Sequence, residues 1–219
     1  MRATQPQLRH PVSPPFGEGR NRILAAAREV FSTSGFEGSS LRKIAEHAGL
    51  QHQLVVHHFK AKDALWREVI DLFFKDFGSQ RTRWLAIRDT DGAAAALRTL
   101  VREFVVFTAR QPEFHRIATF EGRTDNERLR WLLEKHVRPF YAISTALMHE
   151  AQATGSMRSG HPGQLHYAVI GLITTGFVFG PEYTIMTGQD PFAHEAVGAV
   201  MKLACEFLGL PNAPRQNSS

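Results

Sequence analysis

The 219-residue sequence predicts an all-α protein in which three short helices precede a larger helical domain. Apolar residues recur at intervals of three and four through most of the chain. No segment shows the sustained alternation of apolar and polar residues that is typical of strands. The composition, with 43% hydrophobic and 21% charged residues, is that of an ordinary globular protein.

The first two helices are predicted from their apolar faces and their terminal residues. The segment NRILAAAREVF begins the periodic pattern near Asn21, and Gly35 ends it. The next segment, SSLRKIAEHAG, offers Ser39 or Ser40 as an N-cap. Gly49 follows its last apolar residue, where a helix commonly ends in left-handed geometry.

A third segment, QHQLVVHHF, follows after Leu50 and at most one neighbour. Two short helices joined by a tight turn that contains glycine form a helix-turn-helix unit. Val55 and Val56 leave a strand as the alternative for this segment. Because the run is short and its neighbours are helical, we predict a helix.

Long helical patterns dominate the rest of the chain, and prolines punctuate them. We expect Pro112 and Pro181 to end helices and Pro191 to open the last one. Pro139 lies within a long pattern, which it should kink.

These patterns divide the chain into four parts. Residues 1–19 carry four prolines and no apolar periodicity, so we expect a flexible tail. Residues 20–65 should form the helix-turn-helix domain and residues 66–210 the larger domain, with a second tail at 211–219.

The positive charge is concentrated at the N-terminal end. Residues 1–62 hold nine basic and four acidic side chains, which account for the whole formal net charge of +5. A basic segment joined to a neutral body is typical of a protein that binds a polyanion at one end.

The single cysteine, Cys205, excludes an internal disulfide framework and suits a reducing cytoplasm. We find no pattern of a secretion signal at the start of the sequence. The longest apolar run, residues 167–180, is shorter than the roughly 20 residues that cross a bilayer. We therefore expect a cytoplasmic protein with no membrane partner.

Four of the eleven histidines fall between His47 and His58. A helical zinc site needs ligands three or four residues apart, and no two of these histidines have that spacing. Catalysis by histidine needs a positioned nucleophile, yet no serine, threonine or cysteine lies between them. We therefore predict no metal, no cofactor and no catalytic residue, and expect that the protein is not an enzyme.

The remaining interpretation of this segment is contact with nucleic acid. In the second helix of a helix-turn-helix unit the first turn faces the major groove. Gln51, His52 and Gln53 occupy that turn, and their amides and imidazole can bond to base edges. Val56 and His57 follow one turn later, near where the sugar-phosphate backbone should pass.

The stretch RILAAAREVFSTSGFEGSSLRKIAEHAGLQHQLVVHHFKAKDALWREV resembles the DNA-binding domain of the TetR/AcrR family of transcriptional regulators. Its caps, glycines, apolar positions and closing Phe-x-x-Lys follow the family's order. The resemblance implies a homodimeric regulator, usually a repressor, that binds double-stranded DNA at a palindromic operator and is released by a small-molecule effector. It also implies a phosphate contact for Lys62, at the start of the fourth helix. The expected DNA-binding residues are Ser40, Gln51, His52, Gln53, Val56, His57 and Lys62.

The recognition segment departs from the family's pattern. The family commonly has Ser-Lys-Gly or similar where Gln51, His52 and Gln53 stand, and a tyrosine where Val56 stands. The operator therefore cannot be transferred from better-known relatives. A helical scaffold or partner-binding protein of the same fold, without DNA binding, is the alternative function.

Aromatic residues of the larger domain are candidates for lining a cavity for a small apolar or amphipathic effector, with core packing as the alternative for each. They are Phe104, Phe107, Phe114, Trp131, Phe140 and Tyr141. The last two helices combine apolar faces with small residues, which favours a four-helix bundle between two copies of the chain. The candidates for that interface are Gly171, Gly176, Ala199, Leu203 and Phe207.

Overall fold

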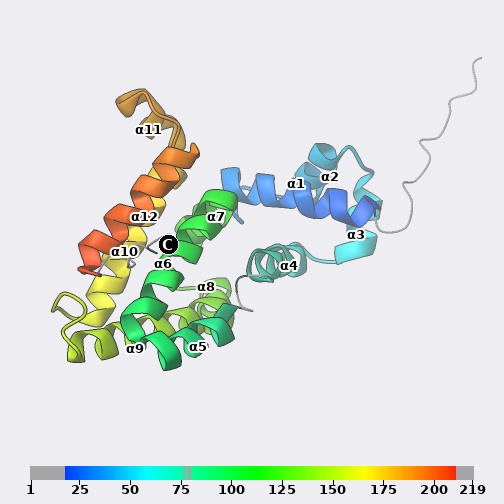
Figure 1. The fold of residues 1–219 in the computed structure, drawn as a ribbon. Coiled ribbons are helices and arrows are strands. Elements are labelled where there is room, and N and C mark those ends of the chain that lie inside the picture. The colour runs from blue at the N-terminus through cyan, green and yellow to red at the C-terminus, as the bar shows by residue number, and fades with distance from the viewer. Residues whose placement is uncertain (1–17, 76, 78–79, 211–219) are drawn as a thin grey trace, which may run out of the picture. The chain divides into compact units, whose positions relative to one another are not determined.

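The computed structural model describes residues 18–75, 77 and 80–210, and these residues form helices and turns without a strand (Figure 1). The all-α prediction is therefore confirmed. The chain divides into two compact units between Val69 and Ile70. The first helix begins at Glu18, ahead of the periodic pattern, and the rest of both expected tails lies outside the described residues.

The first unit holds three complete helices and the start of a fourth. Their bounds are α1 (Glu18–Ser34), α2 (Leu41–Ala48), α3 (His52–Phe59) and α4 (Lys62–Phe74). The apolar faces of α1, α2 and α3 meet in one small core, whose larger buried side chains include Ile23, Phe31, Ile44, Val55 and Phe59. The segment QHQLVVHHF is therefore a helix and not a strand, as predicted.

Local interactions fix the turn between α2 and α3. The Ser40 hydroxyl accepts a hydrogen bond from the Lys43 backbone N–H at 3.1 Å, which confirms Ser40 as the N-cap. Gly49 has a φ of +62°, so the predicted left-handed end of α2 is also confirmed. The Arg22 guanidinium donates to the Ala48 carbonyl at 2.7 Å, and this bond satisfies one of the carbonyl groups left open at the helix end.

The C-terminal end of α3 has an unusual backbone. Lys60 has a φ of +52°, and it is the only residue other than glycine with a positive φ in the described part of the chain. The backbone N–H of Ala61 donates to the Phe59 carbonyl, which makes Lys60 the centre of a three-residue turn. This tight turn separates α3 from α4.

The second unit is a bundle in which α6 packs against α5, α9 and α12. Besides the end of α4, its helices are α5 (Arg81–Asp91), α6 (Ala93–Arg110), α7 (Pro112–Glu121), α8 (Glu127–Leu132), the π-helical turn η2 (Leu133–Val137), α9 (Arg138–Ala153), α10 (Pro162–Val178), α11 (Gly180–Thr187) and α12 (His194–Leu208). Among the described residues no single helix could span a membrane by length and apolar character, although α10 and α11 together pass that test as a pair bent by 80°.

The prolines act differently from the simplest expectation. Pro112 follows the end of α6 and is itself the first residue of α7, and Pro191 does not open α12, which begins at His194. The pattern around Pro139 is interrupted as predicted, and the interruption takes the form of η2, with Pro139 in the first turn of α9. Proline has no N–H and its ring displaces the preceding turn, which accounts for the change of helical pitch ahead of it. α10 ends at Val178, but Pro181 then lies in the first turn of α11 and so also helps to begin a helix.

Two histidines are buried in the second unit and each bonds to a hydroxyl group. His115 Nε2 lies 3.0 Å from Thr108 Oγ1, and His166 Nδ1 lies 3.0 Å from Ser144 Oγ. Burial lowers the pKa of His115 from 6.5 to about 4. Burial has the same effect on His166, whose pKa also falls to about 4. Both imidazole rings are therefore neutral at pH 7.

Candidate nucleic-acid interface

Helix α3 presents polar side chains outward and apolar side chains inward. Gln51, His52, Gln53 and His57 are exposed, and Val56 is 38% exposed among them. Val55 and Phe59 lie one turn apart on the opposite side and are buried. An isolated helix of this length would be unstable in water, so these two anchors hold α3 and its donors in place.

Basic side chains surround α3 within the first unit, and several are already engaged. Arg20 pairs with Glu68, and its guanidinium lies 5.4 Å from the centre of the Phe59 ring. His47, in α2, lies 2.8 Å from a Glu29 carboxylate oxygen. Arg20 and His47 are therefore each already paired with a carboxylate of the same unit.

Lys62 is held by the first unit itself. Its ammonium group donates to the carbonyls of Phe36, at 2.7 Å, and Ser39, at 2.9 Å. The same group lies 4.1 Å from the centre of the Phe36 ring. Lys62 therefore ties the start of α4 to the turn that precedes α2. An ammonium has three N–H donors, so one remains for another partner.

The described residues contain no group of three or more His, Cys, Asp or Glu that could hold a metal ion. The histidines of α3 instead contact one another: the His57 and His58 rings lie 5.6 Å apart at a steep angle, and half-buried His58 also lies against Phe59. His58 thus contributes to packing, whereas His52 and His57 point their rings to the surface.

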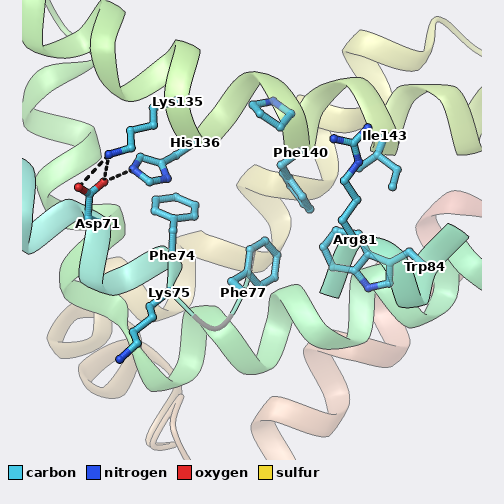
Figure 2. A pocket seen from close by; sticks show the side chains of 11 residues that line it. Asp71, Phe74, Lys75, Phe77, Arg81, Trp84, Lys135, His136, Phe140 and Ile143 are labelled. Atoms are coloured by element: carbon cyan, nitrogen blue, oxygen red, sulfur yellow. Dashed lines mark hydrogen bonds and ion pairs between the residues drawn. The ribbon is translucent and has the colours of Figure 1, made fainter. Parts of the chain in front are cut away.

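The second unit contains a cavity of about 440 Å³ (Figure 2). Its walls come from the end of α4, α5, η2 and the start of α9. The lining residues are Asp71, Phe74, Lys75, Phe77, Arg81, Trp84, Lys135, His136, Pro139, Phe140 and Ile143.

Only one of the six aromatic residues singled out from the sequence, Phe140, lines this cavity. Phe107 lines a second cavity of about 540 Å³ beside α5 and α6. Phe104 and Phe114 are buried in the aromatic core, and Trp131 and Tyr141 line neither of these two cavities. The sequence pattern did not indicate Phe77 or Trp84, because their segment has weak periodicity and they face the cavity only through tertiary packing.

The cavity has a charged cluster at one end. Asp71 accepts hydrogen bonds from the Lys135 ammonium, at 2.8 Å, and from His136 Nε2, at 2.7 Å. The His136 ring stacks on Phe74 with ring centres 4.4 Å apart. Burial lowers the pKa of His136 and outweighs the opposite effect of Asp71. Figure 2 shows this cluster across the hollow from Arg81 and Trp84.

The predicted interface residues lie on or near an apolar surface of α10 and α12. Gly171, Ala199 and Leu203 are exposed, while Gly176 and Phe207 are half-buried. Large apolar side chains are also exposed on α10, α11 and the segments that flank α11: Tyr167, Phe179, Ile185, Met186 and Phe192. Exposure on this scale is typical of a protein-protein contact surface.

Residues 23–69 match the family model described as bacterial regulatory proteins, tetR family. Over 197 residues the chain is 23% identical to the HTH-type transcriptional regulator RutR of Escherichia coli K12, covering 86% of this chain and 90% of RutR. It is 41% identical over 51 residues to the regulator UidR of the same strain, covering 23% of this chain and 26% of UidR.

The fold is similar to that of AibR, whose structure was solved in complex with isovaleryl coenzyme A and operator DNA. The TM-score is 0.69 at 16% sequence identity, and the match covers 89% of this chain and all of the AibR chain.

Proposed function

Because the chain belongs to the tetR family of bacterial regulatory proteins, we propose that it is a transcriptional repressor that acts in the cytoplasm as a homodimer on a palindromic operator. One observation carries the proposal: α3 and its N-cap Gln51 expose two amides and two imidazoles, while the buried Val55 and Phe59 anchor the helix. This helix lies within the segment that matches the family model. The scaffold alternative is not favoured, since it gives these exposed donors no role.

Base reading falls to the first turn of α3. Gln51 and Gln53 can each bond adenine at N6 and N7 together, and His52 can donate to a base edge or accept from one. His57 lies one turn further along, where a phosphate should pass, and the Ser40 hydroxyl at the start of α2 is also exposed. Val56 has no hydroxyl and can offer apolar contact alone.

A homodimer supplies the second recognition helix. Two such helices must lie roughly 34–36 Å apart to enter successive major grooves on one side of the duplex. The apolar surface around α10 and α12 gives two copies a self-complementary contact, with Leu203 exposed by 52% on α12. Dimerisation would remove that surface from water.

The 440 Å³ cavity is the proposed effector site. Its volume lies within the range of roughly 300–1,000 Å³ that small-molecule sites occupy. α4 is one continuous helix that carries Lys62 at its first residue and Asp71 near its end. An effector that favours a different position of Asp71 would bias the start of α4 as well, and a coupling of about 1–3 kcal/mol is typical of such systems.

Substitution of the base-reading residues should relax sequence preference. We expect His52→Ala and Gln53→Ala each to weaken operator binding by about 1–3 kcal/mol and to change binding to random duplex much less. The operator is first obtained by selecting bound fragments from random DNA with the purified protein. Fluorescence anisotropy on both duplexes then gives the affinities, with His149→Ala, an exposed histidine of the second unit, as the control. Equal losses on operator and random DNA would reject the base-reading role.

Lys62→Ala should have two separable effects. Loss of the bonds to Phe36 and Ser39 should destabilise the first unit by about 1–3 kcal/mol, measured by urea unfolding. Loss of a phosphate contact should reduce the dependence of log affinity on log salt by about one. The matched control is Lys43→Ala, which removes an exposed lysine whose ammonium donates to the Ser34 hydroxyl at 2.8 Å. An unchanged salt dependence in Lys62→Ala would mean that Lys62 serves the fold alone.

A further inference from the structure

The cavity of the second unit carries an excess of positive charge. Lys75, Arg81 and Lys135 contribute cations to its lining, against the single carboxylate of Asp71. His136 adds no charge at pH 7, because burial lowers its pKa. A cavity of this composition attracts an anion and disfavours a cationic ligand.

The cationic side chains of the lining differ in whether another group of the protein already binds them. Lys135 is neutralised by Asp71 at 2.8 Å, and its ammonium also lies 4.9 Å from the centre of the Trp131 ring. Within the described residues no ion pair or hydrogen bond satisfies Arg81, which is exposed. In Figure 2 its side chain extends beside Trp84 toward Ile143, whereas Lys75 points away from the other labelled residues. Arg81 is therefore the cation best placed to receive a ligand.

Most of the remaining lining residues are aromatic. The Phe77 ring lies 5.4 Å from the Phe140 ring and 5.5 Å from the Trp84 ring, measured between centres. Trp84 is fixed by its indole N–H, which donates to Glu103 at 2.6 Å. Because that polar edge is already bonded, Trp84 offers its apolar surface to the cavity. Flat aromatic faces held in this way suit a planar apolar body.

We propose that this cavity binds a small carboxylate with a planar aromatic body, the carboxylate on the Arg81 guanidinium and the ring system against the cluster of Phe77, Trp84 and Phe140. Guanidinium and carboxylate form paired, charge-assisted hydrogen bonds, which are stronger than bonds between neutral groups. The ligand class stands on the cavity alone. That such a ligand is the effector of a repressor rests on the proposed function.

The test compares a carboxylate with its neutral isostere on the full-length protein. Isothermal titration calorimetry with 2-naphthoate and 2-naphthamide should show the carboxylate binding at least about tenfold more tightly. The reason is that only the carboxylate can form a charge-assisted contact with the Arg81 guanidinium. Arg81→Gln should abolish that preference and bring the two affinities within about threefold of each other. Arg138→Gln is the matched control, since it removes an exposed arginine of α9 that pairs with Glu134 and does not line the cavity. It should keep the preference for the carboxylate.

A second variant tests the location. Ile143→Trp adds volume to the cavity wall and should weaken both probes at least about tenfold, with the helical circular dichroism spectrum unchanged. Equal affinities of the two probes for the wild type, or no binding at millimolar concentration, would overturn the proposal. So would an equal effect of Arg81→Gln and Arg138→Gln.

The operator assay distinguishes the two proposals. If 2-naphthoate binds with the predicted preference but leaves operator affinity unchanged, the ligand class holds and the effector role of this cavity is lost. If no duplex binds the protein at all, the proposed function fails, and the calorimetry still decides what the cavity accepts.

Discussion

Acid should unfold the second unit steeply, with its free energy of unfolding falling by about 2.3 kcal/mol for each pH unit between pH 6 and 4.5. The cause is the pair of buried histidines, His115 and His166, whose pKa values are each lowered from 6.5 to about 4. Below pH 6.5 both histidines become protonated in the unfolded chain, whereas in the folded chain they stay neutral until the pH approaches 4. The stabilisation is therefore fully present above pH 6.5 and is lost as the pH falls toward 4.

Burial among apolar neighbours explains why the folded state keeps His115 neutral. The Thr108 hydroxyl donates its one proton to the Phe104 carbonyl at 2.9 Å, so it can only accept from His115 Nε2. The ring also lies among Phe104, Phe107 and Phe114, with centres 5.0–5.9 Å away. A charged imidazolium would have no carboxylate among these neighbours to offset its loss of hydration.

Variants separate these histidines from the other acid-sensitive groups. His115→Phe should halve the histidine contribution, reducing the slope by about 1.2 kcal/mol per pH unit. Thr108 keeps its bond to the Phe104 carbonyl in that variant, so it is not left unsatisfied. His149→Gln alters an exposed histidine and should leave the slope as it is. Urea unfolding at several pH values measures each slope, and an undiminished slope in His115→Phe would refute the assignment.

Phe59→Ala should abolish specific DNA binding by releasing α3, the proposed recognition helix. Phe59 is 4% exposed and ends α3, so its truncation leaves a void under that helix. Replacement of a buried phenylalanine by alanine costs about 3–5 kcal/mol. A unit this small has little stability to lose, because small domains bury a low fraction of their surface. We expect operator affinity to fall at least about 100-fold, which corresponds to about 2.7 kcal/mol.

The control for this variant lies three residues earlier. Val56 is on the same helix but exposed, so Val56→Ala should change stability by no more than about 0.5 kcal/mol. Amide hydrogen exchange distinguishes the two units: in Phe59→Ala protection should be lost in α1 to α3 and retained in α6 and α9. Operator binding at wild-type strength in Phe59→Ala would show that α3 does not depend on this anchor.

The first unit was predictable from sequence because its determinants are local. Ser40 and Gly49 act on the backbone within three residues of themselves, and Gly35 ends α1 with a φ of +66°. The engagement of Lys62 was not predictable, since it depends on carbonyls 23 and 26 residues away in the chain. A lysine at a helix start resembles a phosphate ligand in sequence whether or not the protein's own backbone already binds it.

Parts of the second unit could not be predicted from the sequence. α5 and α11 were not predicted: α5 has Trp84 as its one buried member, and α11 has only Gly180, so neither carries an apolar stripe. The cavity joins residues more than 60 positions apart, such as Asp71 and His136. The aromatic residues of the sequence therefore predicted that this domain has an aromatic interior. They could not show which of them lie in the core and which line the cavity.

The backbone at Lys60 implies a compromise between heat tolerance and attraction to polyanions. A lysine with a φ of +52° is strained by about 1–2 kcal/mol relative to a glycine in that position. The unit thus holds a cation at the C-terminal end of the helix proposed to read DNA, in a backbone geometry that weakens this end. A lineage that adapts to higher temperature could gain stability through Lys60→Gly. The same change would remove a positive charge and so lower the affinity for DNA.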